Sequence, residues 1–233
     1  MIAIIQQYGK AFLYSDGYNM TGMAMTLWLL VLALIIGFCL ALPLAIIRNT
    51  KYFVLRGPVW LYCFVFTGTP LYVQLLIIYT GFYSLDFVRH TASLNHFFRS
   101  GLNCTILAFG LNTGAYTTEI FAGSIRETSP GEVDAARSLG FSVFKLYRRI
   151  VIPAALRRAL PAYSNEVVLM LHATTLAFTA TVPDILKIAN DAYSATYNPF
   201  AAFIIAAFLY ACISFLLIFI FRKAEIHFLA FQK

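Results

Sequence analysis

Charged residues are scarce in this chain. Asp, Glu, Lys and Arg make up only 12% of the 233 residues, whereas hydrophobic residues make up 61%. That leaves too little polar surface to coat a water-soluble globule of this length. The composition therefore excludes an ordinary soluble domain and predicts that lipid surrounds most of the chain.

Several signatures of chemical sites are also absent. The sequence lacks GxxxxGK[ST], so it has no phosphate-binding loop of its own. It lacks HExxH and paired intramembrane aspartates, and serines such as Ser164 have no base at helical spacing, which argues against an intramembrane enzyme. The cysteines form no CxxC or Cys/His cluster that could hold a metal, and each is expected to be a small buried hydrophobe. They are Cys39, Cys63, Cys104 and Cys212.

Five stretches are long and apolar enough to cross a hydrocarbon core about 30 Å thick. The second is interrupted by Gly68-Thr69-Pro70, which predicts a broken or kinked backbone. Residues 1–20 lack the pattern of a secretory leader, so the first stretch is expected to remain as a helix. The sequence predicts an all-α polytopic membrane protein, with one transmembrane domain over residues 1–233 and five transmembrane helices. The expected spans are 23–47, 57–85, 100–123, 161–183 and 192–221.

Lys and Arg are distributed unevenly between the two alternating sets of loops. Of the 17 such residues, 13 fall in one set and the other four in the opposite set. Because basic residues concentrate on the cytoplasmic side, the N-terminus is expected outside and the C-terminus in the cytoplasm. Topology then accounts for the formal charge of +7, and no nucleic-acid partner is expected. The four outer residues are Lys10, Arg89, Arg99 and Lys187.

The predicted cytoplasmic loop, residues 124–160, carries signals for short helices. Ser129 suits a helix cap, Pro130 suits the first turn, and Glu132 completes a capping box. Gly140 is expected to separate two short helices. On periodicity alone, the segment could also be an amphipathic helix lying on the bilayer surface. Its apolar or small face would contain Val133, Ala136, Gly140, Val143 and Tyr147.

A spaced motif in this loop favours a specific family. Asp134-Ala135-Ala136 is followed by Gly140 and then by Ile150-Val151-Ile152-Pro153. The pattern resembles the EAA loop of ABC importer permeases, with Asp134 in place of glutamate and Ile152 in place of leucine. The resemblance implies the type I ABC importer permease fold, in which this loop forms cytoplasmic coupling helices that dock on an ATPase subunit. The residues assigned to coupling are Glu132, Asp134, Ala135, Ala136, Gly140, Phe141, Phe144, Ile150 and Pro153.

The resemblance extends over essentially the whole chain, through the segments GTPLYVQ, SGLNCT, AYTTEIFAG, LPAYSNEV and ATVPDILKIA. These resemble M-type permease subunits in the polar amino acid ABC permease family, which import histidine, lysine, arginine or ornithine. The resemblance implies a bacterial inner-membrane location and a heterodimer with a homologous second permease subunit. It also implies an ATPase subunit dimer that binds ATP and Mg, and a periplasmic amino-acid-binding protein. The chain itself is expected to bind no cofactor and to be a transport subunit, not an enzyme.

A charged side chain inside a membrane span costs free energy, so such a residue is first considered as part of a functional site. Glu166 is expected to be a counter-ion for a cationic side chain or an α-amino group, in preference to a structural ion pair, and Asn165 lies beside it. Glu119, near the cytoplasmic end of the third span, is expected to have a stabilising role at the interface. His172 is expected to be a satisfied residue of the bundle core, because no carboxylate lies four residues away.

The broken second span provides further candidates for substrate contacts, namely Thr67, Thr69 and Gln74. Its backbone groups could face a substrate cavity, or the break could be a packing kink, and the sequence leaves both open. A second functional hypothesis also stands. A stand-alone secondary transporter or channel could use Glu166 for proton coupling and would work without an ATPase.

Overall fold

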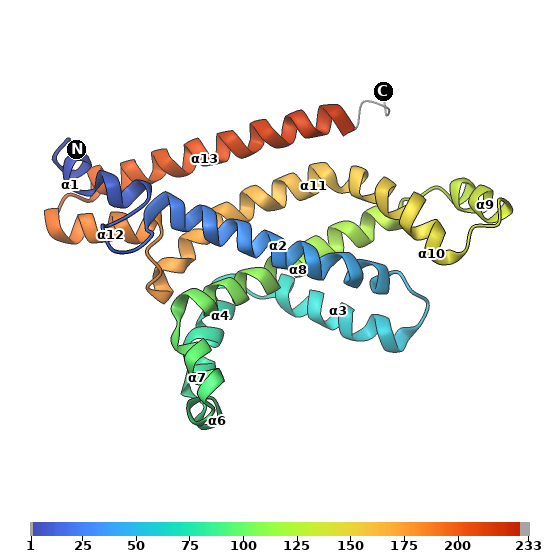
Figure 1. Ribbon diagram of the computed structural model, residues 1–233, viewed down its shortest axis with the longest axis horizontal. Helices are drawn as coiled ribbons and strands as arrows, with labels where there is room; N and C mark the ends of the chain where they lie inside the picture. The colour runs from blue at the N-terminus through green and yellow to red at the C-terminus, as the bar shows by residue number, and fades with distance from the viewer. Residues whose placement is uncertain (1, 229–233) are drawn as a thin grey trace.

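Helices form nearly all of residues 2–228, the part of the chain that the computed structural model describes. The longest helices run along the long axis of the molecule (Figure 1). They are α2 (Gly22–Arg48), α8 (Gly101–Arg126), α11 (Ile152–Ala173) and α13 (Pro199–Phe228). Shorter helices lie at the two ends of this bundle. At one end are α1 (Ile2–Leu13) and α12 (Ile185–Thr196), and at the other are α9 (Pro130–Ser138) and α10 (Val143–Leu146).

In the segment between α2 and α8, the first helix runs alongside the bundle and the elements after it leave the bundle sideways (Figure 1). It begins with α3 (Phe53–Gly68), and the helix that follows is bent from it by 106°. Thr69 is extended, as expected for a residue that precedes proline, and Pro70 has no N–H to continue the helical ladder. The predicted break is therefore confirmed. The remaining elements are α4 (Leu71–Leu76), η1 (Ile77–Gly81), α5 (Phe82–Ser84), α6 (Asp86–His90) and α7 (Ala92–Arg99).

Membrane-spanning potential is clearest in α2 and α13, which are the helices of residues 2–228 that are both long and apolar enough. The bent pair formed by α3 with residues Leu71–Ser84 makes a third candidate. Helices α8 and α11 have comparable lengths, 26 and 22 residues, but they bury polar groups such as Asn112 and Glu166. The helical architecture is confirmed, whereas length and composition do not establish five crossings.

Some helix boundaries differ from the expected spans. Helix α11 begins at Ile152, so residues 152–160, which were expected in the cytoplasmic loop, are helical. It continues as a 3₁₀ segment, η3 (Thr174–Ala180). The stretch 192–221 is not one helix, because α12 ends at Thr196 and Tyr197 adopts a left-handed conformation with φ of 52°. Pro199 then starts α13, as suits a residue without a free N–H.

Close packing of α2 against α8 organises the bundle. A Cβ placed on Gly37 would lie 2.5 Å from Thr113 Cγ2, and the backbone N of Gly114 would lie 3.1 Å away. The two helices therefore approach at a distance that only glycine permits, as small residues allow in membrane helix pairs. At the α1 end, Gly22 has φ of +57° and a Cβ there would lie 2.2 Å from the Phe12 carbonyl oxygen.

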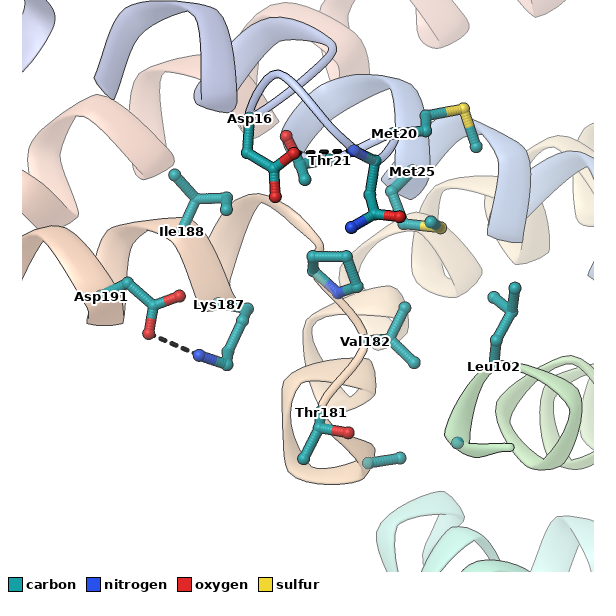
Figure 2. A pocket seen from close by; sticks show the side chains of 14 residues that line it. Asp16, Met20, Thr21, Met25, Leu102, Thr181, Val182, Lys187, Ile188 and Asp191 are labelled. Atoms are coloured by element: carbon teal, nitrogen blue, oxygen red, sulfur yellow. Dashed lines mark hydrogen bonds and ion pairs between the residues drawn. The ribbon is translucent and has the colours of Figure 1, made fainter. Parts of the chain in front are cut away.

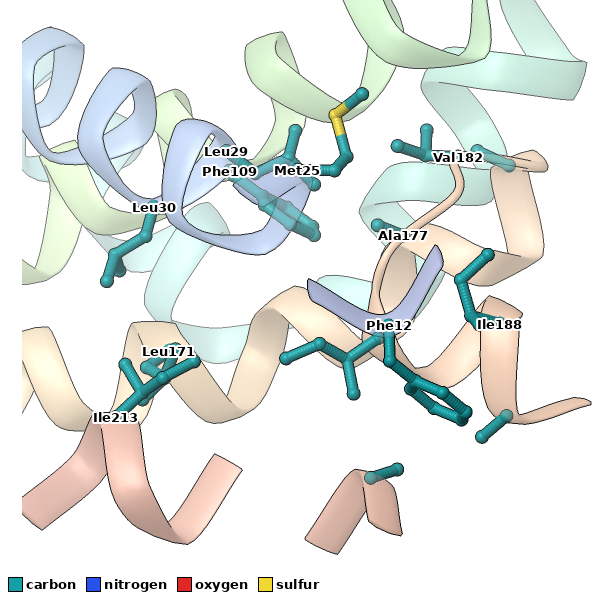
Figure 3. Close-up of a cluster of buried hydrophobic side chains, with 14 of the residues drawn as sticks. Phe12, Met25, Leu29, Leu30, Phe109, Leu171, Ala177, Val182, Ile188 and Ile213 are labelled. Carbon is teal, nitrogen blue, oxygen red and sulfur yellow. The ribbon is translucent and has the colours of Figure 1, made fainter. Parts of the chain in front are cut away.

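The larger apolar cluster joins α1, α2, α8, α11 and α13 (Figure 3). Phe109 and Leu171 are fully buried in it, and Cys104 is also part of it. The expectation for the cysteines holds in part, because Cys63 and Cys104 are buried whereas Cys39 and Cys212 are exposed.

A second apolar cluster lies at the α9 end and joins α2, α8, α9, α10 and α11. It packs the short helices α9 and α10 directly on the bundle. Its buried members include Ala122, Ala136, Leu146, Val151 and Ala155.

Candidate functional site

A polar network surrounds the break between α3 and α4. Gln74 Nε2 donates to the carbonyl oxygens of Phe66 at 2.9 Å and Thr69 at 3.0 Å, and to Thr69 Oγ1 at 2.8 Å. Asn112 Nδ2, from α8, donates to the Phe66 carbonyl at 3.0 Å and to Gln74 Oε1 at 3.1 Å. The carbonyls freed by the break are thus satisfied within the chain. This geometry favours the interpretation that the break is a packing kink, with Gln74 holding it together, over the interpretation that Gln74 faces a substrate cavity.

Thr67 and Thr69 also direct their hydroxyls to the backbone. Thr67 Oγ1 donates to the Cys63 carbonyl at 2.7 Å, and Thr69 Oγ1 donates to the Val65 carbonyl at 2.7 Å. Tyr116, which is 39% exposed, donates through its hydroxyl to the Thr67 carbonyl at 3.2 Å. Asn112 and Tyr116 were not among the residues chosen from sequence. Asn112 could have been, because a polar amide in the middle of an apolar stretch needs a partner.

Glu166 lies inside the bundle between α8 and α11. Its side chain is 7% exposed and accepts a hydrogen bond from Thr113 Oγ1 at 3.2 Å. No Lys, Arg or His among residues 2–228 forms an ion pair with it. The neighbouring Asn165 is exposed. Glu166 is therefore a buried carboxyl group with no cationic partner among the described residues.

Two other predicted polar residues have different environments. Glu119 pairs with Arg48, with Glu119 Oε1 2.8 Å from Arg48 Nε, so its stabilising role joins α8 to α2. Asn49 strengthens this junction by donating to the Ala122 carbonyl at 3.1 Å. The prediction for His172 holds in part, because the ring has a hydrogen-bonding neighbour but does not lie in the core. Its side chain is exposed on α11, and its Nε2 lies 3.3 Å from Ser214 Oγ.

The EAA-like segment comprises α9, the turn at Gly140 and α10. It forms two short helices separated at Gly140, as predicted. Gly140 has φ of +76°, a left-handed conformation that glycine adopts without strain. Ser129 precedes α9 and Pro130 begins it, but the Ser129 side chain makes no capping hydrogen bond. The capping box with Glu132 was therefore wrong, and Glu132 is exposed.

The two faces of α9 differ. Ala136 is only 2% exposed and packs inward against the bundle, whereas Asp134 and Ala135 face outward. The single apolar face expected from periodicity is divided at Gly140, because Val143 lies 70% exposed on the far side of the turn. Ala136 therefore anchors the helix to its own chain.

Large apolar side chains are exposed at the tip of this segment. Leu139, Val143 and Phe144 are 77%, 70% and 73% exposed. Phe141, expected as an anchor beside Phe144, instead packs partly against the second apolar cluster, with Lys145 Nζ 4.5 Å from its ring centroid. Leu139 and Val143 were not among the residues assigned to coupling from sequence, although both are apolar and lie close to the turn glycine in the chain.

The end of the motif connects the segment to α11. Ile150 packs at the edge of the second apolar cluster. Residues 147–151 form a π-helical turn, η2 (Tyr147–Val151), in which the Ile152 N–H donates to the Tyr147 carbonyl. Pro153 explains this turn, because it has no N–H to donate to the carbonyl of Arg149 in an α-helical ladder.

The opposite end of the bundle contains a polar cavity of about 520 Å³ (Figure 2). An ion pair between Lys187 and Asp191 lines one side of it. Asp16 lies on the other side, and the backbone amides of Asn19 and Tyr18 that donate to its carboxylate lower its pKa. The cavity is thus lined by both charge signs and is farthest from the EAA-like segment.

Comparison with known proteins identifies the family. Residues 33–225 match the family described as binding-protein-dependent transport system inner membrane component. The chain belongs to this family of permeases. The permease is 61% identical over 225 residues to the histidine/lysine/arginine/ornithine transport system permease protein HisM of Salmonella typhimurium, covering 97% of this chain and 96% of that protein. It is 42% identical to the nopaline transport system permease protein NocM of Agrobacterium fabrum, over 82% of this chain and 79% of that one.

Solved structures agree with this assignment. The permease superimposes on the structure described as an amino acid ABC transporter with histidines, with a TM-score of 0.75 and 30% identity over 86% of this chain and 89% of that one. The inward-facing methionine transporter MetNI matches with a TM-score of 0.70 over 98% of this chain and 97% of that one. Its identity of 15% supports the fold alone.

Proposed function

We propose that this permease is the M-type transmembrane subunit of an ATP-driven importer that moves histidine or the basic amino acids lysine, arginine and ornithine into the bacterial cytoplasm. The observation that carries the proposal is the EAA-like segment. It is packed on the bundle through Ala136 and exposes Leu139, Val143 and Phe144 at its tip. Three exposed apolar side chains close together in the chain are suited to a protein groove, since exposed apolar patches mark interaction sites.

The proposed substrate class is inferred from the names of similar proteins. A relative that is 61% identical over nearly the whole chain is named for histidine, lysine, arginine and ornithine. The solved transporter with 30% identity is described with histidines. Glu166 fits this class, because a buried carboxylate without a cationic partner in the described residues favours a cationic substrate. Asn165, exposed beside it, is the proposed polar neighbour on the substrate path.

The proposed assembly contains a second homologous permease, two ATPase subunits and a periplasmic binding protein. ATP and Mg belong to the ATPase subunits, since this chain lacks the phosphate-binding loop. We place all of residues 1–233 in one transmembrane unit with five crossings, the N-terminus outside and the C-terminus in the cytoplasm. The excess of Lys and Arg near the α9 end supports this orientation.

The test is purification of the tagged chain from bacterial membranes in a mild detergent. We expect an ATPase, a second permease and a periplasmic protein to copurify. Reconstituted in liposomes, the complex should take up radiolabelled lysine or histidine only with ATP and the periplasmic protein, and vanadate should abolish uptake. Uptake by the permease alone, without an ATPase, would contradict the proposal and favour a secondary transporter.

A further inference from the structure

The side chain of Arg158 bridges three parts of the permease. Arg158 lies on α11, and its Nη2 donates to the Ser124 carbonyl oxygen at 3.0 Å and to Thr128 Oγ1 at 2.7 Å. Ser124 lies in the last turn of α8, and Thr128 immediately precedes Ser129, the residue at the N-cap of α9. A single guanidinium nitrogen thus contacts both sides of the turn that connects the bundle to the EAA-like segment.

Charge and geometry make this contact strong and directional. Ser124 belongs to the group of carbonyls at a helix C-terminus that have no partner within the helix, where a cation is favoured. A hydrogen bond with a charged donor is shorter and stronger than a neutral one, and the guanidinium plane defines its direction. The contact therefore constrains both the position and the orientation of the turn relative to α11.

The other connection between α9 and the bundle is apolar. Ala136 packs against the second apolar cluster, together with Leu146 and Ala155. Contacts between small apolar groups are not directional, so they oppose separation of α9 more than they oppose sliding. Among the described contacts, the bridge from Arg158 supplies the direction that the apolar contact lacks.

One buried donor of Arg158 is unused. Its Nε is buried and has no hydrogen-bond partner within residues 2–228. A buried donor without a partner carries a free-energy cost, which lowers the barrier to leaving this arrangement. The hydrogen bonds of Arg158 Nη2 are thus strong enough to transmit a displacement of the turn. Because Nε has no partner, the side chain can move with the turn.

We propose that Arg158 is a positioning residue that transmits movement of the α9 segment to α11, and so couples ATP hydrolysis to opening of the bundle. The inference rests on the proposed function, because it requires an ATPase to displace α9. Arg158 acts through its contacts with the turn at Ser124 and Thr128. Its loss should therefore separate hydrolysis from transport while both sites stay intact.

The chain offers a matched control. Arg157 has the same charge, is adjacent in α11 and is exposed, with no side-chain hydrogen bond or ion pair among the described residues. The variants are Arg158→Gln, Arg158→Lys, Thr128→Val and Arg157→Gln, each in the complete complex in liposomes. The quantities measured are the ATP hydrolysed, the radiolabelled lysine taken up, and the amount of assembled complex.

We expect Arg158→Gln to raise the ATP hydrolysed per lysine transported by at least about fivefold, the lower end of typical coupling between sites. Thr128→Val, which removes one hydrogen bond, should raise the ratio in the same direction by less. Arg158→Lys should restore part of the coupling, because an ammonium can still donate to the Ser124 carbonyl. Arg157→Gln should leave the ratio unchanged.

Two results would overturn the inference. One is a wild-type ratio in both Arg158→Gln and Thr128→Val. The other is a fall in uptake, hydrolysis and assembled complex in equal proportion, because Arg158 would then serve folding alone. If Arg158→Gln fails to assemble, Thr128→Val decides, since it leaves the arginine in place. Absence of ATP-dependent uptake in the wild-type complex would instead overturn the proposed function, and this inference with it.

Discussion

Replacing Gln74 by leucine removes the side chain that holds the break between α3 and α4 together. Leucine is similar in size but can neither donate nor accept. It therefore loses the polar contacts with the Phe66 and Thr69 carbonyls, Thr69 Oγ1 and the Asn112 amide. The Phe66 carbonyl keeps its bond from Asn112, whereas the Thr69 carbonyl loses its side-chain donor. The damage should therefore concentrate at Thr69.

The magnitude follows from the number of bonds. Side-chain hydrogen bonds in membrane proteins contribute about 0.6 kcal/mol each on average. Gln74 has two N–H groups to donate and accepts one bond, so three full hydrogen bonds give about 2 kcal/mol. For a chain of this length, that free energy corresponds to a lowering of the melting temperature by about 4–8 °C. The assay is thermal unfolding of the purified permease in detergent, followed by tryptophan fluorescence.

A double-mutant cycle sharpens the test. Because Gln74 and Asn112 share a bond and an acceptor, the cost of Gln74→Leu together with Asn112→Leu should be less than the sum of the single costs. Gln7→Leu, at an exposed position on α1, is the control and should leave the melting temperature unchanged. Additive costs, or a stable Gln74→Leu permease that has lost lysine binding, would refute the packing role and return Gln74 to the substrate site.

Other substitutions test the remaining features. Gly140→Val should reduce retention of the ATPase more than Gly140→Asn, because φ of +76° costs a β-branched residue about 1–2 kcal/mol, and equal retention would contradict the turn geometry. Glu166→Gln should weaken lysine transport more than histidine transport at neutral pH, because the substrate loses a counter-ion, and equal effects would remove Glu166 from the site. Phe144→Ser should reduce copurification of the ATPase, whereas Phe53→Ser, at 83% exposure, should not, and equal losses would argue against an anchor at Phe144. Gly22→Ala should destabilise the permease in thermal unfolding, since its Cβ would lie 2.2 Å from a carbonyl oxygen, and an unchanged melting temperature would contradict the close approach of α1.

Some expectations from the sequence were incomplete because they depend on contacts between residues that are far apart in the chain. Glu119 was expected to stabilise an interface, but its partner Arg48 is 71 residues away and no spacing rule connects them. His172 was expected in the bundle core because no carboxylate lies four residues away, yet it occupies an exposed position of α11. Helical periodicity defines which residues share a face, but not which face the rest of the chain covers.

The sequence by itself determined the features that depend on a few neighbouring residues. Composition required a lipid environment, Pro70 broke the second apolar stretch, and Gly140 separated two short helices. A missing N–H or a left-handed backbone has the same local effect in any fold, so these predictions held.

Only the tertiary structure decided how the EAA-like segment is oriented. The motif places Ala136 and Phe141 among the coupling residues, but Ala136 is covered by the second apolar cluster and Phe141 packs toward it, which leaves Leu139 and Phe144 at the exposed tip. The same packing brought Arg158 to the turn at Thr128, 30 residues earlier in the chain. Such contacts depend on how α8 and α11 pack together, which is a property of the whole bundle and not of any local pattern.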